Sequence, residues 1–461
     1  MLMFSYKSWV QTANKKTSIT LYVYFCTLLL LAIFCTKFYL GYTSESLALL
    51  FEGLEFKMLN TSLFSDTLVL LSIIVTIISW YYLSERFLFK SVFFILYFFV
   101  FVFCTMCMVY SSNLMVMFIF FEFIFVPSLF FVFKFGYAKR VEKTISFLLL
   151  WTLSGSFIAL LCFAYTLGVA GSLEVANVSA IRLGFIEQSI LCFFFFIGFG
   201  IKIPVWPFHY WLTKVHVEAP TGFSIFLSGF LVKTAFFCFS YVYVLFCNEV
   251  ITLFCLSVVV WGAIDASIRM WTSSDIKRLI AFATIQEMNL ILLFLLINSN
   301  SSFSIINLFL LVHGVLSAFL FYLVDNIQKR FHTRNLVAIS GLSIVAPQLH
   351  ALIWLGILIF RGFPFFIKLV VEWELLTSLL NSFNIFGFFI FFIVSFFGVI
   401  GFCRIWLSVL YGQPSVAIQK GVDVLKKDLF VGYYFVASLM FLNLFVVFFY
   451  GWCSFKSLQK L

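Results

Sequence analysis

A few ionisable side chains lie inside segments that are otherwise strongly apolar. Glu122 is flanked by FIFF and FIFV, His313 follows FLLV, and Lys202 and Lys233 each interrupt an apolar run. A charged side chain at the centre of a bilayer costs about 3 kcal/mol or more, so such residues are normally paired or mark a conduction path. Carboxylate, amine and imidazole groups in one apolar interior are the groups that proton relays use.

A second group of ionisable residues follows later in the chain. Lys368 and Glu372 are four residues apart, so they share one face of a predicted helix, either as a stabilising ion pair or as a coupled titrating unit. Structural alternatives remain open for the first group: a protonated core carboxyl, a lysine that reaches the interface, or a satisfied core histidine. Three further ionisable residues lie within predicted spans and have a possible role in the same path: Asp265, Glu287 and Arg404.

Two of the charged segments contain predicted helix breaks. Pro204 and Pro207 follow Lys202, and the sequence RGFP at 361–364 precedes Lys368. Proline removes a backbone donor and breaks a helix, and the carbonyl groups that are released are tolerated at membrane depth only beside protein or water. Paired broken helices are typical of transporter sites near the midplane of the membrane.

The composition indicates a polytopic membrane protein. The 461 residues are 64% hydrophobic and 10% charged, and the mean hydropathy is +1.13. The net charge of +10 is attributed to loops on one side of the membrane and not to a nucleic-acid surface. The basic start is followed by a full-length span, so no cleaved signal peptide is expected. The 69 phenylalanines favour an AT-rich gene, as in many organelle genomes.

The sequence contains no pattern for a resident cofactor or metal. Cys104 and Cys107 form a CxxC within an apolar helix, where packing is a better explanation than a redox or metal site. His209, His216 and Glu218 follow the first break at uneven spacing, which favours hinge packing over metal binding. Nothing resembles a nucleotide-binding glycine loop, an iron–sulfur cysteine run or a haem motif.

The hydropathy pattern predicts an all-α fold of about 13 transmembrane helices. Most of the 29 lysines and arginines then fall on one side, with Lys277 counted among the loops, and this bias places the N-terminus inside. The predicted spans lie at 18–41, 66–84, 91–110, 113–133, 145–168, 189–206, 221–247, 250–270, 275–297, 303–327, 345–382, 384–410 and 430–453.

Helices 3–7 and helices 8–12 of this series are two sets of five, and because five is odd the second set has the opposite orientation. The two sets are predicted to be inverted repeats, each with a broken fourth helix. The predicted organisation is residues 1–90 as N-terminal helices, 91–247 and 250–410 as the two repeats, and 411–461 as the C-terminal loop and last helix.

The run KIPVWPFHYWLTKVHVEAPTGFSIFLSGFLVKT at 202–234 resembles the signature of the chain-4 family of NADH:ubiquinone oxidoreductase, respiratory complex I. Similar pieces are FFEFIFVP, WTLSGS, SSDIKRLIAFATIQEM, LVHGVLSAFLF, HTRN and GFPFFIKLVVEWELL, which together cover most of 110–380 in the order of the family. The resemblance implies an antiporter-like, proton-pumping membrane-arm subunit. It assigns the proton path to the matching residues Glu122, Lys202, Lys233, His313 and Glu372.

The same resemblance implies where the protein works and with what. The expected location is the mitochondrial inner membrane, with the N-terminus in the matrix and the C-terminus in the intermembrane space. Expected partners are other membrane-arm subunits and lipids, without nucleic acid. NADH oxidation, flavin, iron–sulfur clusters and ubiquinone reduction belong to other subunits, so this chain carries no redox chemistry.

The chain also departs from the family pattern. It has one predicted helix fewer than the family's 14, Glu287 stands where the family has a histidine, and Arg361 and Lys368 replace uncharged residues. Two other functions compete with the complex I subunit: a subunit of a multi-subunit cation/proton antiporter, which shares the fold, and a structural spacer of the membrane arm.

Overall fold

The fold was analysed in a computed structural model of the chain. The structure describes Val75 and residues 92–135, 141–181, 183–297, 303–414, 423, 428–429 and 431–440. These residues form helices and no strand, apart from two isolated bridge pairs, Asn113–Glu174 and Asp275–Asn335. The predicted spans at 18–41 and 66–84, except Val75, and most of the last span lie outside the described residues. The all-α membrane fold is confirmed.

The helices follow the apolar windows from 91–110 to 384–410. Seven helices of the described part are long and apolar enough to cross a membrane, and shorter apolar helices accompany them. The total of about 13 spans and the two repeats stay predictions. The main helices are α5 (Val92–Tyr110), α6 (Leu114–Phe135), α7 (Val141–Ala170), α9 (Phe185–Lys202), α13 (Glu249–Thr272), α14 (Ile276–Ile297), α15 (Phe303–Phe331) and α19 (Ile385–Leu410).

Both predicted helix breaks are present. Helix α9 ends at Lys202, and α10 (Tyr210–Glu218) resumes after the prolines. Helix α17 (Pro347–Phe360) is separated from α18 (Ile367–Phe383) by the RGFP turn, where Gly362 has φ +64. Glycine adopts this left-handed conformation without a steric penalty. Each break therefore places a lysine at the end or the start of a half-helix.

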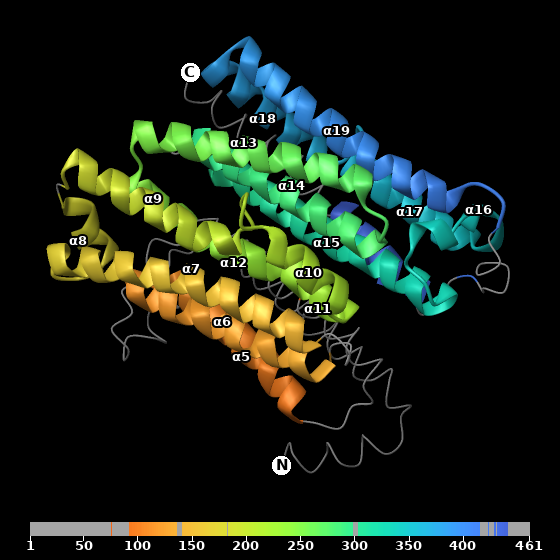
Figure 1. Cartoon of the computed structure of the whole chain (residues 1–461), viewed down its shortest axis with the longest axis horizontal. Coiled ribbons are helices and arrows are strands. Elements are labelled where there is room, and N and C mark those ends of the chain that lie inside the picture. Colours follow the sequence, from red (N-terminus) through yellow and green to blue (C-terminus); the bar gives the residue numbers. More distant parts are fainter. Residues whose placement is uncertain are drawn as a thin grey trace, which may run out of the picture.

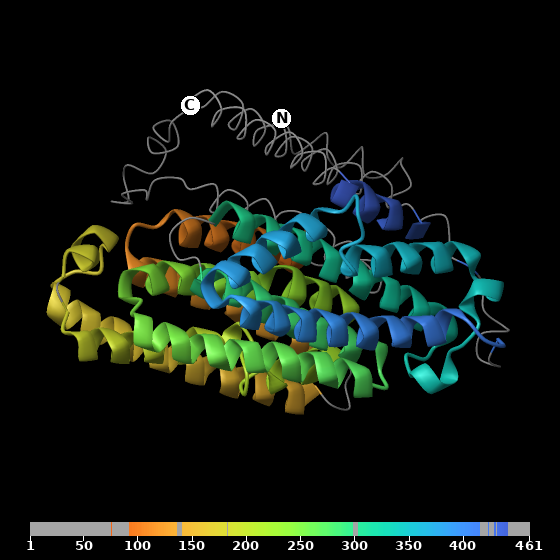
Figure 2. The ribbon, with the colours of Figure 1, turned by 90° about the horizontal axis from the view of Figure 1, so that it is seen from above.

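Three spans form the centre of the bundle. These are α14, α15 and the segment 221–246, which consists of α11 (Thr221–Phe226), the π-helical turn η2 (Leu227–Leu231) and α12 (Val232–Phe246). In each central span 94% of the apolar window is buried, against 39% in α7 and α13 and 28% in α19. Figure 1 shows α12, α14 and α15 between the α5–α7 layer and α19. Figure 2 gives the same bundle turned by 90°. Ionisable residues on the central spans are therefore shielded from lipid.

The connections gather at two opposite ends of the bundle. One end contains α8 (Val175–Ala180) and the α12–α13 turn, and the other contains η3 (Leu336–Ala338), α16 (Leu342–Val345) and the α10–α11, α13–α14 and α15–η3 connections (Figure 1). The sequence places Lys277 among the loop charges of this second end, and the structure corrects that prediction. Its side chain is fully buried in the first turn of α14, where Nζ donates a hydrogen bond to the Ala219 carbonyl at 2.8 Å.

Candidate functional site

Glu122 and Lys202 form a direct ion pair between α6 and α9. Lys202 Nζ lies 2.5 Å from Glu122 Oε1, and the lysine side chain is 1% exposed while the glutamate side chain is 29% exposed. The hydroxyl of Ser156 on α7 donates a second hydrogen bond to the same oxygen at 2.8 Å. The rings of Phe121 and Phe125 lie 4.2 and 4.6 Å from Nζ. The sequence-predicted pair is therefore assembled in a poorly solvated interior, where the aromatic rings add a favourable contact to the amine.

Lys233 lies halfway along the central span 221–246 and is completely buried. Its Nζ donates a hydrogen bond to the Ser228 carbonyl, five residues earlier, within η2. A π-helical turn changes the hydrogen-bond register by one residue, and such turns occur often at functional sites. No carboxylate of the described residues lies within ion-pair distance of Lys233. Its charge interacts electrostatically with Glu287 of α14.

His313 lies on α15 and is 3% exposed. Neither of its ring nitrogens has a hydrogen-bond partner among the described residues. The charges of Lys233 and Lys368 both act on the ring. Buried polar groups are nearly always hydrogen-bonded, by protein or by ordered water, so the imidazole is expected to bind water.

Lys368 lies in the first turn of α18 and is the centre of a second charge cluster. Its Nζ lies 2.6 Å from Glu287 Oε1 and 3.5 Å from Glu372 Oε1, and it also donates a hydrogen bond to the Phe360 carbonyl. Lys368 and Glu287 are almost fully buried, and Glu372 is 21% exposed. The Lys368–Glu372 contact agrees with the predicted spacing. The closer partner, Glu287, comes from another helix and could not be paired with Lys368 from spacing.

The other two candidate residues, Asp265 and Arg404, are not part of the Glu122–Lys202 pair or the Lys368 cluster. Asp265 binds the exposed Arg269 at 2.8 Å and lies 3.4 Å from His209 Nε2, so it holds α13 against the first break. The Arg404 side chain is exposed and lies over the Trp271 ring at 5.2 Å. Both residues make contacts at the edge of the bundle, away from the central spans.

Three buried polar residues near one end of the bundle were not predicted as part of the proton path: the sequence assigned His216 to hinge packing and Lys277 to a loop, and it gave Asp325 no role. His216 is fully buried, its ring is stacked on Phe321 at 4.7 Å, and its nitrogens have no hydrogen-bond partner among the described residues. Asp325 is also fully buried. It accepts a hydrogen bond from Thr221 at 2.5 Å and forms an ion pair with Lys329 at 2.7 Å. Lys277 is the third. The Asp325–Lys329 spacing of four residues is a signal that could have revealed Asp325.

The central ionisable residues make one discontinuous line through the bundle. It starts at Glu122 and Lys202, and Cys238 of α12 links this pair electrostatically to the helix that carries Lys233. It continues through His313 to the Lys368 cluster. Each member can bind and release a proton, which is the property that a relay requires. In the described part of the chain, no three His, Cys, Asp or Glu side chains converge as metal ligands do.

A family profile matches the chain across this whole region. The family is described as "NADH:quinone oxidoreductase/Mrp antiporter, TM", and the match covers residues 111–398. The chain belongs to this family. The matched range contains every member of the line from Glu122 to Glu372, so the family region and the buried ionisable residues coincide.

Two relatives carry the names of NADH-ubiquinone and NADH-quinone oxidoreductase subunits. NADH-ubiquinone oxidoreductase chain 4 of Paramecium tetraurelia is 35% identical over 76% of this chain and 74% of its own length. NADH-quinone oxidoreductase subunit M of Rickettsia conorii is 29% identical over 66% of this chain and 62% of its own length. The chain therefore spans about three quarters of the first relative and less than two thirds of the second.

Solved structures of the family share the fold. A chain of respiratory complex I from Thermus thermophilus superposes with a TM-score of 0.72 at 19% identity, covering 83% of this chain and 82% of that chain. A chain of the Mrp complex from Dietzia gives a TM-score of 0.71 at 18% identity, covering 78% of this chain and 69% of that chain. These matches agree with the antiporter-like architecture predicted from the sequence.

Proposed function

We propose that this chain is a membrane-arm subunit of the chain-4 type and translocates protons along its buried line of ionisable residues. Electron transfer from NADH to ubiquinone on other subunits would drive this transport. The observation that carries the proposal is the placement of Glu122–Lys202, Lys233, His313 and Lys368–Glu287 on or against the central spans. A bundle that served only as a spacer would gain nothing from burying so many charges.

The first step of the proposed path is the opening of the Glu122–Lys202 pair. While the pair is closed, the amine of Lys202 contacts the carboxylate and the adjacent aromatic rings. When Glu122 turns away, an ammonium group would be left without its carboxylate in a poorly solvated site, which favours release of its proton. The partial exposure of Glu122 gives it room for this movement.

Lys233 and His313 form the middle of the path. Among the described residues Lys233 has only the Ser228 carbonyl as its direct partner, so its amine can accept a proton and give it up without breaking an ion pair. His313 can take a proton on one ring nitrogen and release another from the second nitrogen. The charges of Lys233 and Lys368 both act on this ring, which would couple the two lysines.

The Lys368 cluster ends the proposed path. Two carboxylates share one lysine, so a proton that arrives can be held there by Glu372, the more exposed of the two. Glu287 takes the place that the family pattern gives to a histidine. Exit through Glu372 follows from the resemblance to the family.

The decisive experiment replaces Lys233 with alanine in the intact complex. We expect NADH-driven proton translocation to fall by about 100-fold, because a positioned proton-transfer group contributes at least that much to the step that it serves. Translocation is measured as dye response in sealed vesicles, and assembly is checked on native gels. Glu122→Ala should give the same result. Lys214→Ala is a matched control, since its amine lies beside the Phe147 and Tyr210 rings outside the line. Normal translocation in both path variants would refute the proposal.

The proposed surroundings follow from the relatives and the charge bias. The chain would lie in the mitochondrial inner membrane, with lipids and other membrane-arm subunits around it and the N-terminus in the matrix. Flavin, iron–sulfur clusters and ubiquinone would be bound by other subunits. The second candidate, a subunit of a cation/proton antiporter, is favoured by the structural match to the Mrp complex. Purification of the native complex separates the two, because a complex without flavin and iron–sulfur centres would identify the antiporter.

A further inference from the structure

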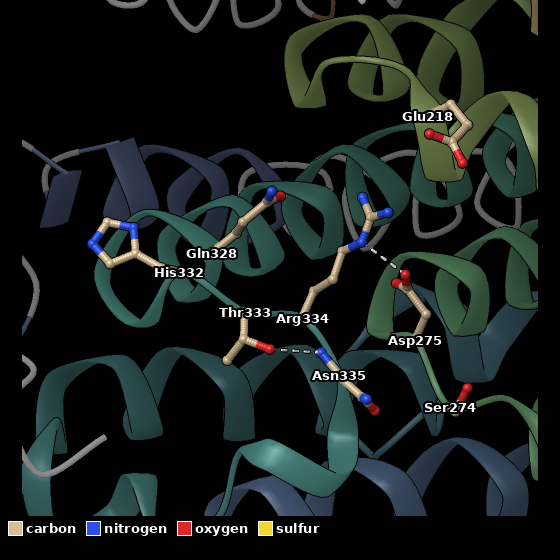
Figure 3. A pocket seen from close by; sticks show the side chains of 8 residues that line it. All are labelled: Glu218, Ser274, Asp275, Gln328, His332, Thr333, Arg334 and Asn335. Carbon is tan, nitrogen blue, oxygen red and sulfur yellow. Dashed lines mark hydrogen bonds and ion pairs between the residues drawn. The ribbon is translucent and has the colours of Figure 1, made fainter. Parts of the chain in front are cut away.

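A polar pocket opens at the end of the bundle where α10, α14 and α15 have their connections. Its volume is about 480 Å³. The lining residues come from the α10 end, the α13–α14 turn and the end of α15, as Figure 3 shows: Glu218, Ser274, Asp275, Gln328, His332, Thr333, Arg334 and Asn335. The proposed path gives this pocket no role.

The wall between the pocket and the bundle interior is held by polar contacts. Arg334 binds Asp275 at 2.7 Å, as drawn in Figure 3, and donates a hydrogen bond to the Val217 carbonyl at 2.7 Å. Lys277 donates a hydrogen bond to the Ala219 carbonyl from the interior. The backbone on either side of Glu218 is therefore fixed, and Glu218 lines the pocket while the preceding turn of α10 faces inward.

His216 occupies that inward turn, two residues before Glu218. It is completely buried, and neither ring nitrogen has a hydrogen-bond partner among the described residues. Burial, together with the charges of Lys277 behind the pocket wall and Lys233 at the middle of the bundle, lowers the pKa of His216 to about 3, so the ring is neutral between transfers. A fully buried imidazole without hydrogen bonds is unusual unless water reaches it.

We propose that this pocket is the mouth through which protons from the aqueous phase reach Lys233, with His216 as the connecting group. The inference rests on the proposed function and adds the entry point to it. Water in the pocket supplies the proton. One ring nitrogen of His216 binds it, and the other nitrogen releases a proton through an intervening water to the neutral amine of Lys233, so one bond to hydrogen forms for each that breaks. Rotation of the ring or a second water restores the starting state.

The charges around the pocket fit a mouth for protons. Glu218 and Asp275 supply carboxylates, which attract protons to the entrance. Arg334 also lines the pocket and pairs with Asp275, and Lys277 lies behind the wall. By the bias in loop charges, this end of the bundle faces the matrix, from which a respiratory pump takes its protons.

Chemical rescue tests the role of His216. His216→Ala should reduce NADH-driven proton translocation of the intact complex by about 100-fold, the contribution of a positioned proton-transfer group. Added imidazole should restore a large part of the rate, because it can enter from the pocket and occupy the vacated volume beside Phe321. His350→Ala is the matched control, since this histidine of α17 bonds to Trp354 outside the line and should pump normally with or without imidazole.

A second measurement tests the pocket itself. Ser274 is exposed and lines the pocket, so Ser274→Cys can be modified with a bulky thiol reagent that does not cross membranes. The modified complex should translocate protons at least about tenfold more slowly because a positioned proton donor, here pocket water, has been displaced. Ser179→Cys, exposed in α8 at the opposite end, should be insensitive to the reagent.

The outcomes separate this inference from the proposed function. Normal translocation in His216→Ala, or a loss that imidazole does not restore in assembled complex, overturns the role of His216. If His216→Ala does not assemble, the modified Ser274→Cys complex decides the matter, and an unchanged rate overturns the mouth. Lys233→Ala tests the path independently. A loss in Lys233→Ala together with normal rates at His216 and Ser274 leaves the function in place and removes only this entry.

Discussion

The two broken helices present their lysines in different ways. At the first break, Lys202 has one carboxylate partner, Glu122, which is 29% exposed. At the second break, Lys368 has two carboxylates and a backbone carbonyl, and its closest partner, Glu287, is 4% exposed. Similar backbone interruptions therefore support one loosely held ion pair and one tightly held cluster.

The difference indicates a division of labour between the two sites. A pair with a partly exposed partner opens at a moderate cost, because water can replace the lost contact. A fully buried pair separates at a high cost, because both charges would be left in a low-dielectric interior. We therefore expect the first site to act as the switch and the second to hold a charge in place while protons pass.

The largest expected effect is on stability at the second site. Lys368→Met leaves Glu287 buried without its amine, and breaking a buried pair in this way costs about 3–5 kcal/mol. Lys202→Met leaves the more exposed Glu122, with its Ser156 hydrogen bond, and should cost about 1–3 kcal/mol. Thermal inactivation of the purified complex measures which variant loses more stability, with Lys214→Met as the control. Equal losses of stability in the two variants would show that the first site is not held more loosely than the second.

An intermediate effect is expected when only the charge of the cluster changes. Glu287→Gln keeps the shape of the side chain but removes one of the two carboxylates around Lys368. Proton output per NADH oxidised should fall by about tenfold or more, as for loss of an acid–base group. Glu374→Gln is the matched control, because Glu374 lies on α18 outside the cluster. An unchanged output in Glu287→Gln would make this residue a structural partner of Lys368.

The smallest effect is expected at the hydroxyl that supports the first pair. Ser156→Ala removes one hydrogen bond to Glu122, worth about 1 kcal/mol. The pair should open more easily or close less completely, and turnover should change by about fivefold. Ser154→Ala removes a hydroxyl that bonds only to its own helix and should leave turnover unchanged. A silent Ser156→Ala variant would mean that Lys202 alone positions the glutamate.

Much of the fold could be predicted because the membrane limits the choices. Apolar length identified the spans, and proline and glycine identified both breaks, since each signal acts within one segment. Glu122, Lys202, Lys233 and His313 could be selected as a set because an ionisable residue in an apolar helix stands out. The structure puts all four in the interior of the bundle or at its centre.

Contacts between distant segments could not be predicted from local patterns. The Lys368–Glu287 pair joins α18 to α14, and spacing alone suggested Glu372 as the partner. Lys277 looked like a loop charge because it follows a polar turn, but helix packing covers it completely. Arg404 lies within the span α19, as predicted, but its side chain is exposed. Burial depends on which face of a helix meets a neighbour, and near-uniform hydrophobicity removes the pattern that would reveal that face.

The π-helical turn η2 has a consequence for the angular position of everything that follows it. One extra residue in a turn of helix shifts the phase of the later residues by about 100° relative to an uninterrupted α-helix. Lys233 comes directly after this shift, and its bond to the Ser228 carbonyl spans the inserted residue. Removing one residue from 227–231 would keep the composition and length of a membrane span while turning Lys233 to a different neighbour. The direction of the Lys233 side chain is thus set by the number of residues in the turn and not by the identity of any one of them.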